Sequence, residues 1–253
     1  VDDKSRREER PFDLKIKFPR SKFLQNKGPD FNAGEARNLG IETSTGDWLL
    51  FADADDTFSE GAIDLIVNEI NQCSNKIDII FFGVTSWNEE RMETGSRHLG
   101  VQWKIDEYLK DCSEKNLRFH WTEPWAKAIN ADLIKKRNIQ FDSIIASNDV
   151  MFSFICGLHA RCIRVRPSIV YCVHESPDSL TGRLTPLRAL ARLDALIRVN
   201  SKKRDLGIDG RLDRGYYYFV KSIGANSLRN QIKIYTSFLR YSVLRIFYGT
   251  GLG

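Results

Sequence analysis

Long apolar runs and paired cysteines are both missing from this sequence. No apolar stretch approaches the ~20 residues that a helix needs to cross a bilayer. The five cysteines are an odd number and form no Cys-x-x-Cys pair, so neither a disulfide framework nor a zinc site is indicated. Internal repeats and low-complexity segments are also absent. We therefore expect a protein that is soluble or peripheral to a membrane, in a reducing, cytoplasmic compartment.

Charge is distributed unevenly along the 253 residues. Residues 183–253 carry 14 Lys and Arg against 4 Asp and Glu, a net +10, which leaves −5 for the preceding part. With 42% apolar residues, the chain can bury the core of one large domain with an appendage. The basic C-terminal part points toward an anionic surface as its partner. It contains no recognisable reading motif, so nucleic-acid binding is not expected.

Alternating helical and strand patterns predict an α/β fold. A helix over 35–43 and a strand over 48–52 are followed by a helix capped by Ser59, whose apolar positions 63, 66, 67 and 70 form one face. The run 77–84 is apolar apart from Asp78 and predicts a strand covered on both faces. The segment 86–100 reads as irregular. The remaining predicted elements are helices over 105–109, 131–137 and 148–158, a strand over 163–173, and helices from Leu187 onward.

The strand over 48–52 ends in three carboxylates, Asp53, Asp55 and Asp56. Like charges this close repel one another, so a cation among them is expected. Carboxylate oxygens suit Mg²⁺ or Mn²⁺, and such ions combine few protein ligands with substrate phosphates. Open α/β sheets also bind their ligands at the carboxyl ends of strands. The alternative for the whole run is a solvated acidic turn. Asp56 either supports the cluster or is simply a helix-leading or turn-capping carboxylate.

Six elements follow one another along the chain. They are Val1-Asp2-Asp3-Lys4-Ser5; Asn26-Lys27-Gly28 with Ala36-Arg37-Asn38-Leu39-Gly40; the Asp-x-Asp motif in Phe51 to Asp56; Pro124-Trp125-Ala126-Lys127; Asn148-Asp149-Val150-Met151-Phe152; and Tyr171 to Leu180. In this order they resemble the motifs of the inverting family 2 glycosyltransferases of the GT-A fold, of the type that builds bacterial cell-surface polysaccharides. Six ordered elements make the resemblance specific.

The resemblance covers most of residues 1–182 and implies a fold. It is a Rossmann-like, mainly parallel sheet flanked by helices, followed by a basic helical C-terminal extension over 183–253. Strands stop and Pro and Gly cluster near 176–186, which supports a boundary there. The family places a strand and a helix before its first motif, so we expect these to be missing ahead of Val1. A truncated sheet would leave full activity in doubt.

The resemblance also implies an activity. It is the inverting transfer of a sugar from a nucleotide-diphosphate donor, a UDP-sugar by family frequency, to a hydroxyl of a glycan or lipid-linked acceptor. Asp55 is expected to hold Mn²⁺ or Mg²⁺, which neutralises the departing diphosphate. Asp53 is expected at the ribose, Asp2 and Asp3 at the base, and Arg37 beside the nucleotide pocket. For Arg37 the alternative is a charge on a helix surface.

Inversion requires a base that removes the proton of the acceptor hydroxyl, and the resemblance assigns this role to Asp149. Taken alone, Asp149 reads as a helix N-cap rather than as a base, and the position in the family motif reverses this. Asn148 stands where the family has Glu, so an acceptor-positioning charge is lost there, and Asn148 itself is the candidate contact. Trp121 is a second candidate, since an indole face stacks on a pyranose. Core packing is its alternative, and we expect it for Trp125.

For each of three further features, two interpretations remain open. His174 either completes the metal shell or contacts the diphosphate, or it is an ordinary strand-end histidine. Arg183 either pairs with phosphate oxygens in a lid or lies in a solvated loop. The segment 228–248 interleaves basic and apolar residues, which suits an amphipathic helix at the inner face of an anionic membrane or a helix docked on protein.

Two other functions stay open. The run from Asp53 to Thr57 also fits the Asp-x-Asp-x-Thr pattern of haloacid dehalogenase-type phosphohydrolases, in which Asp53 would be the nucleophile. A catalytically degenerate, glycosyltransferase-like binding subunit is the non-enzymatic alternative.

Overall fold

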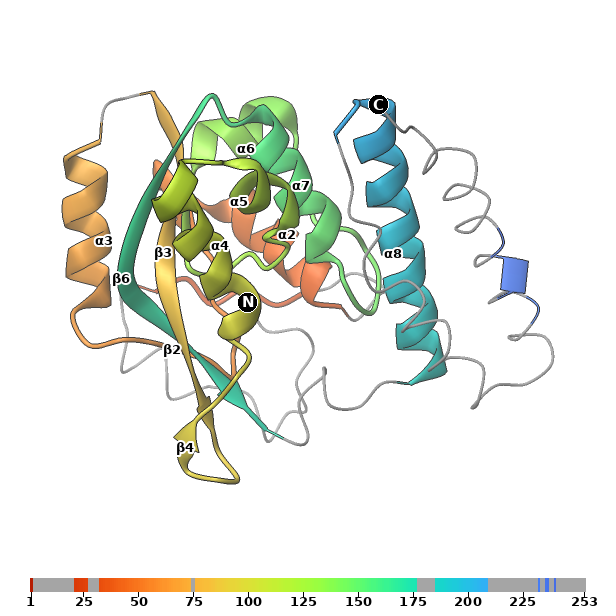
Figure 1. Cartoon of the computed structure of the whole chain (residues 1–253), viewed down its shortest axis with the longest axis horizontal. Helices are drawn as coiled ribbons and strands as arrows, with labels where there is room; N and C mark the ends of the chain where they lie inside the picture. Colours follow the sequence, from red (N-terminus) through yellow and green to blue (C-terminus); the bar gives the residue numbers. More distant parts are fainter. Residues whose placement is uncertain are drawn as a thin grey trace.

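The computed structural model describes residues 1, 21–26, 32–73, 76–176 and 185–208, together with the separate residues 232, 235, 236 and 239. Figure 1 shows a curved sheet with helices on its two faces and α8 at the outside. The described elements are α2 (Ala33–Thr43), β1 (Trp48–Leu50), β2 (Thr57–Phe58), α3 (Ala62–Asn71), β3 (Ile77–Asn88), β4 (Glu93–Thr94), α4 (Leu99–Asp111), α5 (Lys115–His120), β5 (Lys127–Asn130), α6 (Ala131–Arg137), α7 (Asp149–His159), β6 (Cys162–Glu175) and α8 (Pro186–Asp205).

The sheet has the order β1-β5-β3-β6-β2, with β4 paired to the end of β3. Its central pair, β3 and β6, is parallel, whereas β5 runs antiparallel to β1 and β3, and β2 runs antiparallel to β6. Leu49, Ile129 and Ile79 face one another across three strands and are all buried. The sheet is therefore mixed, where the sequence led us to expect a mainly parallel one. Apolar runs indicate that a strand is buried but carry no information about its direction.

Helices cover the two faces of the sheet unequally. α3 packs on β6 at one face, while α4 packs on β3 and the helices α2, α5, α6 and α7 lie toward the other (Figure 1). The middle of β3, residues 79–82, is almost wholly buried between these layers. This confirms the strand expected over 77–84. It continues to Asn88 and meets β4 in a hairpin, so part of the segment expected to be irregular is strand.

The apolar face predicted for α3 is only partly correct. Ile66 is buried, but Ile63 and Val67 are each 46% exposed. α3 also begins after Gly61, which has a φ of 70°, and no side chain caps it. The predicted cap, Ser59, accepts a bond from the backbone N–H of Ala62 through its carbonyl oxygen instead (3.1 Å). A short helix on one edge of a sheet buries a narrower stripe than its periodicity predicts.

Asp78, the charged residue inside the apolar run of β3, has its own partner. Arg161 donates to it from the backbone N–H (2.7 Å), Nε (3.0 Å) and Nη2 (2.8 Å). Burial opposes ionisation of this carboxyl, but the bonds and charge of Arg161 outweigh it and hold the pKa of Asp78 below its usual range. The ion pair joins the start of β3 to the turn before β6.

α8 packs against α7 and buries Ala189, Leu193 and Val199. Arg198 on α8 pairs with both carboxylate oxygens of Asp142 (2.8 and 3.1 Å). Among the described residues, no helix combines the length and apolar character that crossing a bilayer requires. The segment 228–248 lies outside the described residues except at four positions, so its predicted amphipathic helix stays a prediction.

Candidate functional site

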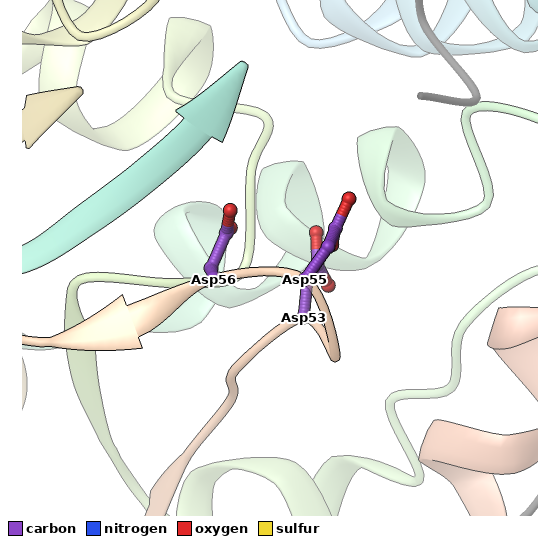
Figure 2. A group of neighbouring side chains, drawn as sticks. All are labelled: Asp53, Asp55 and Asp56. Atoms are coloured by element: carbon purple, nitrogen blue, oxygen red, sulfur yellow. The ribbon is translucent and has the colours of Figure 1, made fainter. Parts of the chain in front are cut away.

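The three carboxylates of the acidic turn come together between β1 and β2. One ligand oxygen from each of Asp53, Asp55 and Asp56 lies within 4.8 Å of the others. Figure 2 shows the three side chains extending to the same side of the turn. Asp55 is exposed, whereas Asp53 and Asp56 are partly buried. The sequence prediction of one acidic cluster therefore holds in three dimensions.

Tyr171 on β6 fixes the shape of this turn. Its hydroxyl accepts a bond from the backbone N–H of Asp53 (2.9 Å) and donates to Oδ2 of Asp56 (2.9 Å). The backbone N–H of His174 donates to the other oxygen of Asp56 (2.9 Å). Burial raises the pKa of Asp56, the two bonds oppose this, and the charges of Asp53 and Asp55 add to it. Asp56 thus anchors the turn to β6.

Arg37 links the acidic turn to the start of α7. One guanidinium nitrogen forms an ion pair with Asp53, and the other, Nη1, donates to Oδ1 of Asn148 (2.8 Å). The helix that carries Arg37 starts at an N-cap, Asn32, whose side chain accepts from the N–H of Glu35 (2.9 Å). The guanidinium also lies 5.3 Å from the ring centroid of Phe141. Arg37 is therefore held between the acidic turn and the start of α7, and its predicted place beside the nucleotide pocket stays a prediction.

Asp149 is the first residue of α7. Burial raises the pKa of its carboxyl to about 7; Glu123 adds to the rise, Arg37 opposes it, and Asp53 adds to it more weakly. Asp149 directly follows Asn148, and Arg37 bonds to both Asn148 and Asp53, so the start of α7 lies beside the acidic turn. The N-cap of α7 is Asn148, and its side chain makes no capping hydrogen bond because it bonds to Arg37.

His174 lies beside the acidic turn but its ring is engaged elsewhere. Nδ1 pairs with Glu89, and Nε2 lies within hydrogen-bond distance of Oγ1 of Thr57 (2.9 Å). Within the part of the chain that the structure describes, the group of side chains able to share a cation comprises the three carboxylates without His174. Ligation by His174 requires one of these two contacts to break.

The predicted aromatic contact has no support. Trp121 is 1% exposed and packs against Phe81 and Trp125 at centroid distances of 5.3 and 6.5 Å. A sugar therefore cannot stack on its indole, and core packing explains this residue. Trp125 is buried as expected and stacks on Tyr171 at 5.4 Å with an angle of 10° between the rings. The positions Asp2, Asp3 and Arg183 lie outside the described residues.

Lys127 belongs to one of the six motif elements, but sequence reasoning gave no role to it or to Glu123. Lys127 is 4% exposed, and burial lowers its pKa to about 7 against the opposing charges of Glu123, Cys156 and Asp149. Its ammonium donates to the backbone oxygen of Trp121 (2.8 Å). The available signal was a lysine placed between the apolar residues 125–126 and 128–129. Nothing local marks Glu123, because its neighbours are distant in sequence.

Comparison with known proteins settles the family. The model described as "Glycosyl transferase family 2" matches residues 1–135, more than half of the chain and including the acidic turn. The chain belongs to glycosyltransferase family 2. The predicted resemblance is thereby confirmed. The phosphohydrolase alternative is wrong, because the turn on which it rested lies within the matched region.

The family 2 chain is similar to a curated protein of Bacillus subtilis (strain 168), the uncharacterized glycosyltransferase EpsJ. The two are 26% identical over 152 residues, which are 58% of this chain and 43% of EpsJ. The chain therefore spans less than half the length of that relative.

Solved structures of S. aureus TarS share the fold. The fragment 1–349 in complex with UDP-GlcNAc has a TM-score of 0.60 and 14% identity, covering 87% of this chain and 64% of that one. The complex of the same fragment with UDP gives a TM-score of 0.61 at 14% identity, covering 91% and 67%. At this identity the likeness shows the fold alone, and it confirms the predicted GT-A architecture.

Proposed function

We propose that this chain transfers a sugar from a UDP-sugar to a hydroxyl of a glycan or lipid-linked acceptor, with inversion at the anomeric carbon. One observation carries the proposal: Arg37 bridges Asp53 of the acidic turn and Asn148, the residue before Asp149. The guanidinium of Arg37 thus contacts the acidic turn, where the charged donor would bind, and also Asn148. Asn148 directly precedes Asp149, the carboxyl with the raised pKa. The TarS structures with UDP-GlcNAc and UDP support a nucleotide-sugar donor.

The acidic cluster suits a divalent cation by its chemistry. Three carboxylate oxygens within 4.8 Å are hard ligands of the kind that Mn²⁺ and Mg²⁺ prefer. We assign Asp55, the exposed member, as the metal ligand and Asp53 to the ribose of the donor. When bound, the cation would act as a Lewis acid on the departing diphosphate. His174 is retained as a secondary ligand, and Asp2 and Asp3 as contacts to the nucleotide.

Asp149 is assigned as the general base. A base is most effective when its pKa lies near the working pH, and burial raises the pKa of Asp149 to about 7. It removes the proton of the acceptor hydroxyl as that oxygen attacks the anomeric carbon opposite the leaving diphosphate. Arg37 holds Asn148 in place, and Asn148 is retained as an acceptor contact.

We further infer the organisation of the whole chain. Residues 1–182 form the transferase domain, and the basic extension 183–253 makes peripheral contact with the inner face of a membrane, where lipid-linked acceptors are found. This part of the proposal rests on the charge distribution, with a net +10 over 183–253.

A thermal-shift experiment on the full chain tests the donor site. UDP and UDP-GlcNAc, each with Mn²⁺, should raise Tm, because a ligand that binds only the folded state stabilises it. Asp55→Asn should remove the part of the shift that depends on Mn²⁺. Asp64→Asn, which changes an exposed carboxylate on α3, should leave the shift unchanged. Absence of any shift from either nucleotide would count against the donor proposal, and binding without release of UDP would indicate a degenerate binding subunit.

A further inference from the structure

The turn that carries the three carboxylates is closed by hydrogen bonds between its first and last residues. The carbonyl oxygen of Asp53 accepts a bond from the backbone N–H of Asp56 (3.2 Å). The hydroxyl of Tyr171 spans the same two residues, because it accepts from the N–H of Asp53 (2.9 Å) and donates to Oδ2 of Asp56 (2.9 Å). Asp55 lies between them, is exposed and extends from the turn (Figure 2). One hydroxyl therefore holds both ends of the turn that presents Asp55.

Tyr171 is itself fixed within the core. Its side chain is wholly buried, and its ring stacks on Trp125 at a centroid distance of 5.4 Å with an angle of 10°. Phe58, its partner in the pairing of β2 with β6, meets the ring edge-on at 5.6 Å. A side chain packed this closely keeps one rotamer, so the position of its hydroxyl is fixed before any ligand binds.

A fixed support matters here because the three carboxylates repel one another. One oxygen from each lies within 4.8 Å of the others, and like charges at this separation favour an open turn. Two other contacts each hold one end of the turn. The N–H of His174 donates to Oδ1 of Asp56 (2.9 Å), and the guanidinium of Arg37 pairs with Asp53. The hydroxyl of Tyr171 joins both ends, so it opposes the repulsion most directly.

We propose that Tyr171 is a positioning residue for the cation site, and that Trp125 contributes by holding the ring of Tyr171 in place. Neither residue touches the cation or the donor. Ligands that are oriented in advance lose less freedom on binding, and residues that orient metal ligands typically change metal affinity 10- to 100-fold. The inference rests on the proposed role of Asp55 as a metal ligand. It gives the buried Trp125, a member of one of the six motif elements, a function at the site.

Amide hydrogen exchange of the full chain, kept in EDTA, tests the support without any metal. Tyr171→Phe removes one oxygen atom and keeps the ring. Exchange at the N–H groups of Asp53 and Asp56 should become roughly threefold to tenfold faster, because the first loses its acceptor and the second lies in a turn that opens more readily. Tyr108→Phe is the matched control: Tyr108 is a partly buried tyrosine on α4, and its substitution should leave both rates unchanged.

A titration with Mn²⁺ alone, in which electron paramagnetic resonance measures the free ion, tests the consequence for binding. Tyr171→Phe should weaken Mn²⁺ binding by about tenfold or more, and Tyr108→Phe should not change it. Leu193→Ala separates positioning from a general loss of stability. It removes a wholly buried side chain from α8 and should lower Tm while Mn²⁺ affinity stays at the wild-type value.

The outcomes distinguish this inference from the proposed function. Unchanged exchange at Asp56 or unchanged Mn²⁺ affinity in Tyr171→Phe would overturn the role of Tyr171. Should that variant not fold, Trp125→Phe replaces it, with a smaller loss of Mn²⁺ affinity expected and an unchanged affinity counting against the proposal. A wild-type chain that binds no Mn²⁺ would instead refute the metal role of Asp55.

Discussion

At the scale of single residues, the site depends on one guanidinium that serves two partners. Arg37 pairs with Asp53 and donates to Asn148, so it holds the acidic turn and the start of α7 in one arrangement. A planar fork with several fixed donors can do this, whereas an ammonium is a single point charge.

Arg37→Lys should therefore lower the transfer rate by about tenfold or more while the fold is retained, because the charge remains but one of two contacts is lost. The rate of UDP release from UDP-GlcNAc and the Tm would be measured together. Arg91→Lys is the control, since Arg91 is exposed and its ion pair with Glu93 is long, at 3.7 Å. Equal rates for Arg37→Lys and the wild type would contradict the bridging role.

We expect the carboxyl of Asp149 to lower the stability of the fold when it is ionised, although the proposed transfer reaction requires it. Its pKa is raised from 3.8 to about 7 in the fold, so its contribution to stability is full below pH 4 and is lost as the pH rises through 7. Asp149→Asn, which stays neutral, should be more stable than the wild type at pH 8, by several degrees in Tm, and equally stable below pH 4. Transfer should fall about 100-fold or more.

A pH series of melting curves tests this. Asp64→Asn, on exposed α3 surface, should show no difference from the wild type at any pH. A less stable Asp149→Asn at pH 8 would mean that the ionised carboxylate is held by favourable contacts.

At the scale of elements, the parallel pair β3–β6 forms the centre of the sheet and contains a local irregularity. The register shifts on both sides of Gly83. A Cβ at this position would lie 2.2 Å from the backbone oxygen of Pro167, so β6 approaches β3 too closely for any side chain there. The glycine is required by packing between strands.

Gly83→Ala should consequently lower the free energy of unfolding by about 2 kcal/mol, because backbone has to move to admit a methyl group. Gly100→Ala provides the matched control: no atom lies within 4 Å of its Cβ position in α4, and a gain of up to about 1 kcal/mol is expected. Urea unfolding measures both. Similar effects of the two substitutions would show that β3 and β6 can separate at low cost.

At the scale of the whole molecule, α8 is joined to the site by contacts distant in sequence. Arg198 pairs with Asp142, whose backbone N–H donates to the carbonyl oxygen of Asn148 (3.0 Å). The helix that begins the basic extension thus supports the loop leading to Asp149. The predicted boundary between residues 182 and 183 stays a prediction, but α8 and α7 share a buried contact.

We expect α8 to unfold together with the rest of the described fold. Leu193→Ala removes a wholly buried side chain from α8 and should shift one cooperative transition, with a loss of about 2 to 5 kcal/mol. Leu187→Ala, at a position 60% exposed, should change stability by no more than about 0.5 kcal/mol. Denaturation would be followed by both tryptophan fluorescence and circular dichroism. A separate unfolding transition of α8 would contradict the prediction.

The sequence by itself determined those features that depend on residues close together along the chain. The periodicity and capping residues gave α2, α6, α7 and β6 within a few residues, and the run of carboxylates gave the acidic cluster, because these signals depend on neighbours along the chain. The tertiary structure alone decided the mixed direction of the sheet, the bridge made by Arg37 and the burial of Trp121. Strand direction, burial and charge interactions all arise between residues far apart in sequence, where no local pattern records which groups will meet.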